Sequence, residues 1–184
     1  RTNLAVLILF LFMALFAVDV ASAQSGAEAF AAGIPVSGRT VILGTWSWDI
    51  ERNEQVRSKF VDVWWEQVNG EKKILVPIGR AGITRIPDRD YDSIGIADLA
   101  EMKYGRKGLE NTFLTPGAVL ALRTAEGNYA KIKVIGYRPP HDFSFEEVKL
   151  AGARWKNSVI TQPDVLQYHL EVEWTLYPKP AIEP

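Results

Sequence analysis

Asp88, Asp90 and Asp92 stand at alternate positions and form the most suggestive acidic stretch of the chain. Carboxylates with this spacing begin the calcium loop of an EF-hand, which also requires glycine at its sixth position and glutamate at its twelfth. Those two positions hold Ser93 and Leu99. We therefore interpret the stretch as a solvated acidic turn, with Asp92 or Ser93 at the start of a helical region. A looser calcium site is the alternative.

His169, Glu171 and Glu173 alternate with apolar residues and share one face of a predicted strand. Imidazole and carboxylate groups bind zinc, but zinc ligands usually come from more than one element, and the second histidine, His141, lies in a predicted loop. We predict that this face is solvated and that the protein has no metal or cofactor. The chain has no cysteine, which excludes thiolate metal sites and cysteine nucleophiles.

Trp64 falls on the same face as Asp62 and Glu66 in the sequence KFVDVWWEQV, and the opposite, core-facing set is Val61, Val63 and Trp65. An exposed tryptophan can stack on a sugar ring or anchor a protein interface. The alternative is that both faces of the sheet are covered and that Trp64 is also a core residue. Asp62 and Glu66 form a carboxylate pair of the kind that glycosidases use, although any β-protein offers such pairs.

Two short turns bounded by glycine carry cations, Gly79-Arg80-Ala81-Gly82 and Gly105-Arg106-Lys107-Gly108. Their side chains could meet an anion such as a lipid head group, and the simpler reading is a pair of solvated connections. We predict no catalytic residue. The predicted interaction residues are Trp64, Asp62, Glu66, Arg80, Arg106 and Lys107.

A period of two dominates from Thr40 to Tyr177 and predicts strands that would position these residues. The predicted strands lie in the segments 40–50, 59–68, 71–79, 118–124, 128–137 and 166–177. One helix of about two turns is expected from Ile96, with Gly105 as its stop. The expected fold is mainly β, an antiparallel β-sandwich or open barrel with one short helix, preceded by an N-terminal apolar helix. Lys131 and Lys133 are expected on a solvated face.

The N-terminal sequence is apolar from Leu4 to Val18 and leads into Ala21-Ser22-Ala23, a typical cleavage site. We expect residues 1–23 to be retained as a signal anchor, that is, a transmembrane helix; cleavage after Ala23 and secretion is the alternative. The residues expected in the membrane are Leu4, Leu7, Phe10, Phe12, Leu15 and Val18. We expect a flexible linker over 24–39, one β-domain over 40–177 and a proline-rich tail over 178–184.

The distribution of charge predicts the side of the membrane. Arg1 precedes the apolar run and the next basic residue is Arg39, so the positive-inside rule places the N-terminus in the cytoplasm of a bacterium and the β-domain in the periplasm. Lys and Arg number 21 and Asp and Glu number 22, so there is no basic excess to bind nucleic acid.

Three motifs carry a family resemblance: GTWSWDIE, DVWWEQ with LVPIGRAGI, and TPGAVLALRTAEGNYAKIKVIGY. Together they resemble exported bacterial β-rich domains of unassigned function. The resemblance implies an exported β-domain and supplies no catalytic residues.

We therefore expect a non-catalytic, membrane-anchored periplasmic accessory or scaffolding subunit of a larger membrane complex, of respiratory or photosynthetic type. Its expected partners are other subunits and lipid. The alternative is a secreted β-module that binds carbohydrate or another small ligand through exposed aromatic residues. A hydrolase that uses two carboxylates is a third reading, for which a cleft with two acids of raised pKa would be the sign.

Overall fold

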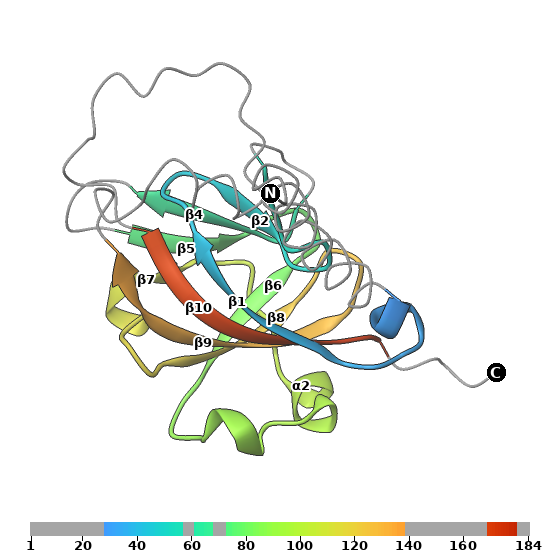
Figure 1. Ribbon diagram of the computed structural model, residues 1–184. Coiled ribbons are helices and arrows are strands. Elements are labelled where there is room, and N and C mark those ends of the chain that lie inside the picture. Colours follow the sequence, from blue (N-terminus) through green and yellow to red (C-terminus); the bar gives the residue numbers. More distant parts are fainter. Residues whose placement is uncertain (1–27, 57–60, 68–72, 139–168, 180–184) are drawn as a thin grey trace, which may run out of the picture.

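Two antiparallel sheets make up the computed structural model, which describes residues 28–56, 61–67, 73–138 and 169–179 (Figure 1). The first sheet has the order β1 (Val36–Ile42), β10 (His169–Tyr177), β9 (Tyr129–Arg138), β8 (Val119–Arg123) and β6 (Gly82–Ile86). The second has the order β3 (Glu54–Val56), β2 (Ser47–Asp49), β4 (Val63–Gln67), β5 (Lys73–Pro77) and β7 (Leu109–Glu110). The expected mainly β fold is confirmed. The expected apolar helix over 1–23 and His141 lie outside the described residues.

The larger hydrophobic core lies between the two sheets. Trp48 of the second sheet meets Trp174 of the first in an edge-to-face contact, with ring centroids 6.0 Å apart. Such aromatic pairs add stabilisation to the burial of their large apolar surfaces. The alternation correctly predicts these members of the core: Ile42, Trp48, Ile50, Val63, Trp65, Ala130, Ile132, Val134, Leu170, Val172, Trp174 and Leu176.

The segment 40–50, predicted as one strand, is divided between the two sheets. β1 ends at Ile42 in the first sheet and β2 begins at Ser47 in the second. Between them Thr45 has a φ of 65°, which breaks the extended backbone. The prediction of a single strand was therefore wrong, because alternation of buried side chains continues through a corner at which the chain changes sheets.

A short helical region covers the outer face of the first sheet. It contains a 3₁₀ turn, η1 (Tyr91–Ser93), and a helix, α2 (Ile96–Glu101), which lies on the side of the first sheet away from β2, β4 and β5 (Figure 1). Asp90 caps η1 by accepting from the Asp92 amide, so the helical region starts earlier than predicted. The predicted helix is confirmed as α2. A second 3₁₀ turn, η2 (Asn111–Phe113), follows β7.

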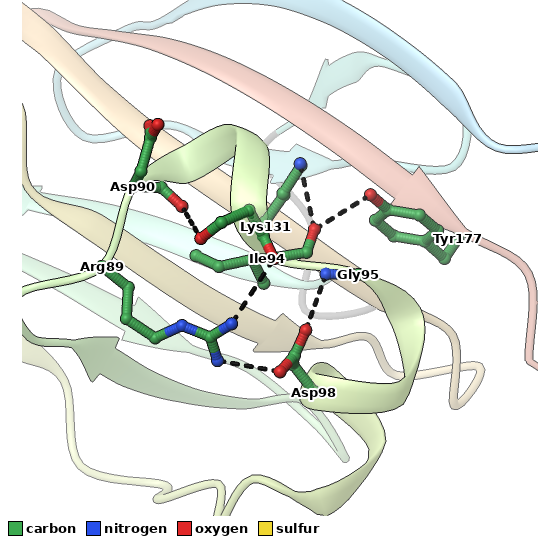
Figure 2. A network of polar contacts seen from close by, with 8 residues as sticks. Arg89, Asp90, Ile94, Gly95, Asp98, Lys131 and Tyr177 are labelled. Carbon is green, nitrogen blue, oxygen red and sulfur yellow. Dashed lines mark hydrogen bonds and ion pairs between the residues drawn. The ribbon is translucent and has the colours of Figure 1, made fainter.

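This cover forms a second hydrophobic cluster with the outer side chains of β6 and β8. Its buried members are Ile86, Tyr91, Ile94, Leu99, Val119 and Ala121. Inside the cover, Gly95 donates its N–H to the Asp98 carboxylate at 2.9 Å, and Arg89 pairs with Asp98 at 2.8 Å (Figure 2). The first sheet is therefore buried on both faces over β8 and β9.

Lys131 of β9 lies beneath this cover and is only 6% exposed. Its Nζ donates to the carbonyl oxygen of Ile94 at 3.1 Å (Figure 2). It also donates to the carbonyl oxygen of Tyr91 at 2.8 Å and lies 4.3 Å from the centre of the Tyr91 ring. The predicted solvated position of Lys131 was wrong, because alternation cannot reveal that η1 lies over that face. Lys133, two residues further on, remains partly exposed.

Replacing Lys131 by methionine keeps an apolar stem of similar length and removes the donor to both carbonyls. We expect Lys131→Met to lower the free energy of unfolding by about 1–3 kcal/mol, because a buried hydrogen-bonded charge is lost and its acceptors remain. Lys133→Met on the same strand is the matched control, with an expected change within about 0.5 kcal/mol. Urea unfolding measures both, and equal losses for the two variants would contradict the buried role of Lys131.

Candidate functional site

Three acidic side chains, Asp49, Glu51 and Asp62, converge where the second sheet meets the turn between β8 and β9. Each offers a carboxylate oxygen, and these oxygens lie within 4.8 Å of one another. Asp49 ends β2, Glu51 lies in the turn to β3, and Asp62 stands directly before β4. We call these three residues the carboxyl cluster.

The Asp62 side chain connects the two sheets by accepting hydrogen bonds from backbone amides. One carboxylate oxygen accepts from the Ile50 amide at 3.0 Å and the other from the Ala125 amide at 2.8 Å. Ala125 belongs to the turn that joins β8 and β9 of the first sheet, so Asp62 reaches from one sheet to the other. Asp62 is 1% exposed. Its predicted place beside Trp64 on an interaction face was therefore wrong, because its carboxylate is occupied at the junction of the two sheets.

The cluster favours a proton on Asp62. Burial, and secondly the negative charge of Glu51, raise the pKa of Asp62 to about 8. Burial also raises the pKa of Asp49. Glu51 accepts from the Asn128 side-chain amide at 3.0 Å through Oε1, while its Oε2 is buried and accepts no N–H. Protonated Asp62 is the neighbouring group that can hydrogen-bond the Glu51 carboxylate.

Carboxylate oxygens in this number are also the ligands that calcium prefers. Here, however, both oxygens of Asp62 accept backbone N–H groups, and Asp49 accepts from the Arg52 amide at 3.0 Å and lies 3.6 Å from its guanidinium. The turns around the cluster thus supply partners to Asp62 and Asp49, whereas Glu51 Oε2 depends on a proton carried by Asp62. We interpret the carboxyl cluster as a proton-sharing junction that holds the ends of the two sheets together.

Trp64 and Glu66 lie on the outer face of the second sheet, as their strand phase predicts. Trp64 is half-buried and stands opposite Ser47 of β2 and Val76 of β5. Glu66 is also half-buried and stands opposite Ile74. Trp64 therefore lies on the outer face of the second sheet, half-buried and outside the hydrophobic core between the two sheets.

The two basic turns lie side by side at the edge strand β6. Ile83 and Gly105 exchange backbone hydrogen bonds of 2.8 and 3.1 Å, and the Arg106 guanidinium donates to the Gly79 carbonyl oxygen. A Cβ at Gly82 would lie 2.8 Å from the Cβ of Tyr104, so only glycine permits this close approach. Arg80, Arg106 and Lys107 are exposed. We call these three residues the basic edge; the sequence reveals its members but not their proximity.

His169, Glu171 and Glu173 do not form a common solvated face. His169 is 9% exposed and its Nδ1 accepts from the Gly44 amide at 3.0 Å, and burial lowers its pKa to about 4. Glu171 accepts two bonds of 2.7 Å from Arg138, and Glu173 lies 3.8 Å from Arg39. The predicted exposure of His169 was wrong, because the 43–46 corner covers the start of β10.

Comparison with known proteins places the chain in no family: no family model, no curated protein and no solved structure matches it. The resemblance to exported bacterial β-rich domains stays a prediction.

A search for membrane-crossing helices covers only the described part of the chain, and no helix there is long and apolar enough to cross a bilayer. The expected anchor over 1–23 lies outside that part.

We expect Asp62 to make the protein less stable as the pH rises from about 4 to about 8. In this range the folded state retains a proton that the unfolded state has lost, because the folded pKa is about 8 and the ordinary value is 3.8. Stability then falls by at most about 1.4 kcal/mol per pH unit. Urea unfolding across this range should show that, as the pH rises, the free energy of unfolding of Asp62→Asn increases relative to that of the wild type.

The comparison with Asp62→Asn isolates the aspartate. The lowered pKa of His169 gives both proteins an opposite slope between about 4 and 6.5, which cancels in the difference. Asp92→Asn, which removes an exposed carboxylate, is the control for the loss of one acidic group. Parallel curves for Asp62→Asn would refute the shared proton. A calcium-dependent gain in wild-type stability above pH 8, lost in Asp62→Asn, would instead identify a cation site.

Proposed function

We propose that this protein is a non-catalytic accessory or scaffolding subunit of a larger membrane complex, of respiratory or photosynthetic type. Residues 1–23 would hold it at the bacterial inner membrane with the N-terminus in the cytoplasm, and the two-sheet domain would lie in the periplasm. Its partners would be neighbouring subunits and lipid. The observation that carries this proposal is the basic edge, where two turns distant in sequence present their cations together.

The position of the basic edge suits a second point of contact with the membrane. β6 and β1 are the two edges of the first sheet, and the N-terminal segment enters through β1. A cation near an anionic membrane surface contributes about 1 kcal/mol, so the basic edge would add an electrostatic contact to the apolar anchor. An anchor at one edge and cations at the other would limit the orientations that the domain can adopt.

Purification from native membranes in mild detergent tests the accessory role. We expect the full chain to elute with other subunits and its intact mass to include residues 1–23. A protein that elutes alone and lacks residues 1–23 would refute the proposal and favour a secreted form.

The second candidate function is a secreted β-module that binds carbohydrate or another small ligand. The half-buried position of Trp64 on an outer sheet face, beside Glu66, favours it, because a tryptophan there can stack on a sugar ring while a carboxylate accepts from its hydroxyls. Retention of the wild type on a glycan panel, lost in Trp64→Ala, would support this reading. If the wild type binds none of the glycans on the panel, carbohydrate binding as the function is contradicted for those glycans.

The basic edge should respond to anionic lipid. In the full chain reconstituted in phosphatidylcholine vesicles, adding phosphatidylglycerol should slow amide hydrogen exchange in 79–82 and 105–108, because contact with head groups shields the turns. Charge reversal at Arg80, Arg106 and Lys107 should abolish the effect, whereas Lys179→Glu, an exposed lysine near the β8–β9 turn, should preserve it. Equal slowing in the reversed variant would exclude a role of these cations.

A further inference from the structure

We infer that the outer face of the second sheet is a docking surface for an amphipathic, basic segment of a partner protein. The inference rests on the proposed accessory function and specifies the surface and the chemistry through which that function would operate. It is carried by the strand register, which aligns apolar side chains in one row and places acids on both sides of that row.

The strand register forms an apolar strip across four strands, in which three apolar side chains accompany the buried Ser47. Ser47 of β2 stands between Val56 of β3 and Trp64 of β4, and Trp64 in turn stands opposite Val76 of β5. Neighbouring strands are about 4.8 Å apart, so the row spans roughly 14 Å. Val56, Trp64 and Val76 are each half-buried. Trp64 stands near the middle of the strip, where an interface usually places its anchor.

Acidic side chains border the strip on both sides. On one side lies Glu54 of β3, and on the other Glu66 and Glu110 both stand opposite Ile74. The outward positions of these strands include no lysine or arginine among the described residues. Glu54, Glu66 and Glu110 form no ion pair with any described residue. The strip therefore favours a partner whose apolar residues are flanked by cations.

The two outer faces of the sandwich differ in what covers them. The first sheet is covered by η1 and α2, and the Lys131 ammonium group donates hydrogen bonds there to carbonyl oxygens of the protein itself. On the second sheet, the outward-facing Val56, Trp64 and Val76 are half-buried and belong to neither hydrophobic cluster of the described residues. At its border Gly108 approaches β5 so closely that a Cβ would lie 2.5 Å from the side chain of Ile74. This close contact closes one end of the strip.

A direct binding measurement tests the surface. The full chain is placed in nanodiscs of zwitterionic lipid, with empty nanodiscs as the blank, and titrated with a labelled peptide of alternating leucine and lysine. A peptide of alternating leucine and glutamate is the matched probe. We expect anisotropy to show binding of the basic peptide only, weakened about tenfold or more between about 0.05 M and about 0.5 M salt.

Two variants locate the binding. Trp64→Ala should weaken it about tenfold or more, as the loss of a central aromatic anchor does, and Phe113→Ala, at an exposed phenylalanine of η2, is its control. Joint reversal of Glu66 and Glu110 to lysine should weaken it similarly while preserving Trp64; Glu101→Lys on α2 is the control for charge. Equal binding of the two peptides, or unchanged binding by both surface variants, would overturn the inference. Retention on glycans that depends on Trp64, without peptide binding, would reassign the strip to sugar.

Failure of this surface and failure of the accessory function give different results. If native membranes yield a complex that is undiminished by Trp64→Ala and by the reversal of Glu66 and Glu110, the accessory function stands and this surface is overturned. If the peptide binds as expected but native membranes yield the protein alone, the surface stands and the accessory function fails.

Discussion

The corner between β1 and β2 determines how the two sheets face each other. Within four residues the chain leaves the first sheet and enters the second, which releases backbone groups from strand pairing. Two buried side chains replace those partners: Gln55 accepts from the Leu43 amide and donates to the Val41 carbonyl, and His169 accepts from the Gly44 amide. Because buried amides need partners, the corner is stable only with these residues in place. The contact between Trp48 and Trp174 follows from that geometry.

Alternation in the sequence predicted the longer strands and much of the inter-sheet core, but it missed β3, β6 and β7 and merged β1 with β2. It failed at three polar positions for the same physical reason. Lys131, Asp62 and His169 each have the phase of a surface residue, yet a segment distant in sequence lies over each of them. A strand pattern reports which side of a sheet a residue faces, but whether that side meets water depends on contacts that no local period encodes.

For the candidate sites too, the sequence identified the residue types but not which of them lie close together in space. The strand phase of Trp64 and Glu66 was enough to place them on an outer face. The two glycine-bounded turns were identified as basic, but their proximity depends on the pairing of Ile83 with Gly105. The carboxyl cluster was not predicted as a unit. Asp49 and Glu51 are near neighbours in the sequence, whereas Asp62 joins them only because β4 pairs with β2.

Lys131 lowers the free-energy cost of lifting η1 and α2 away from the first sheet. While η1 and α2 are in place, its ammonium group relies on two carbonyl oxygens in place of water. If the cover lifts, apolar contacts are lost but the ammonium regains its hydration, which partly offsets the loss. The segment over this lysine is therefore a natural unit of partial unfolding that can separate while the Trp48 and Trp174 core stays closed. A single buried cation thus divides one domain into two regions of unequal stability.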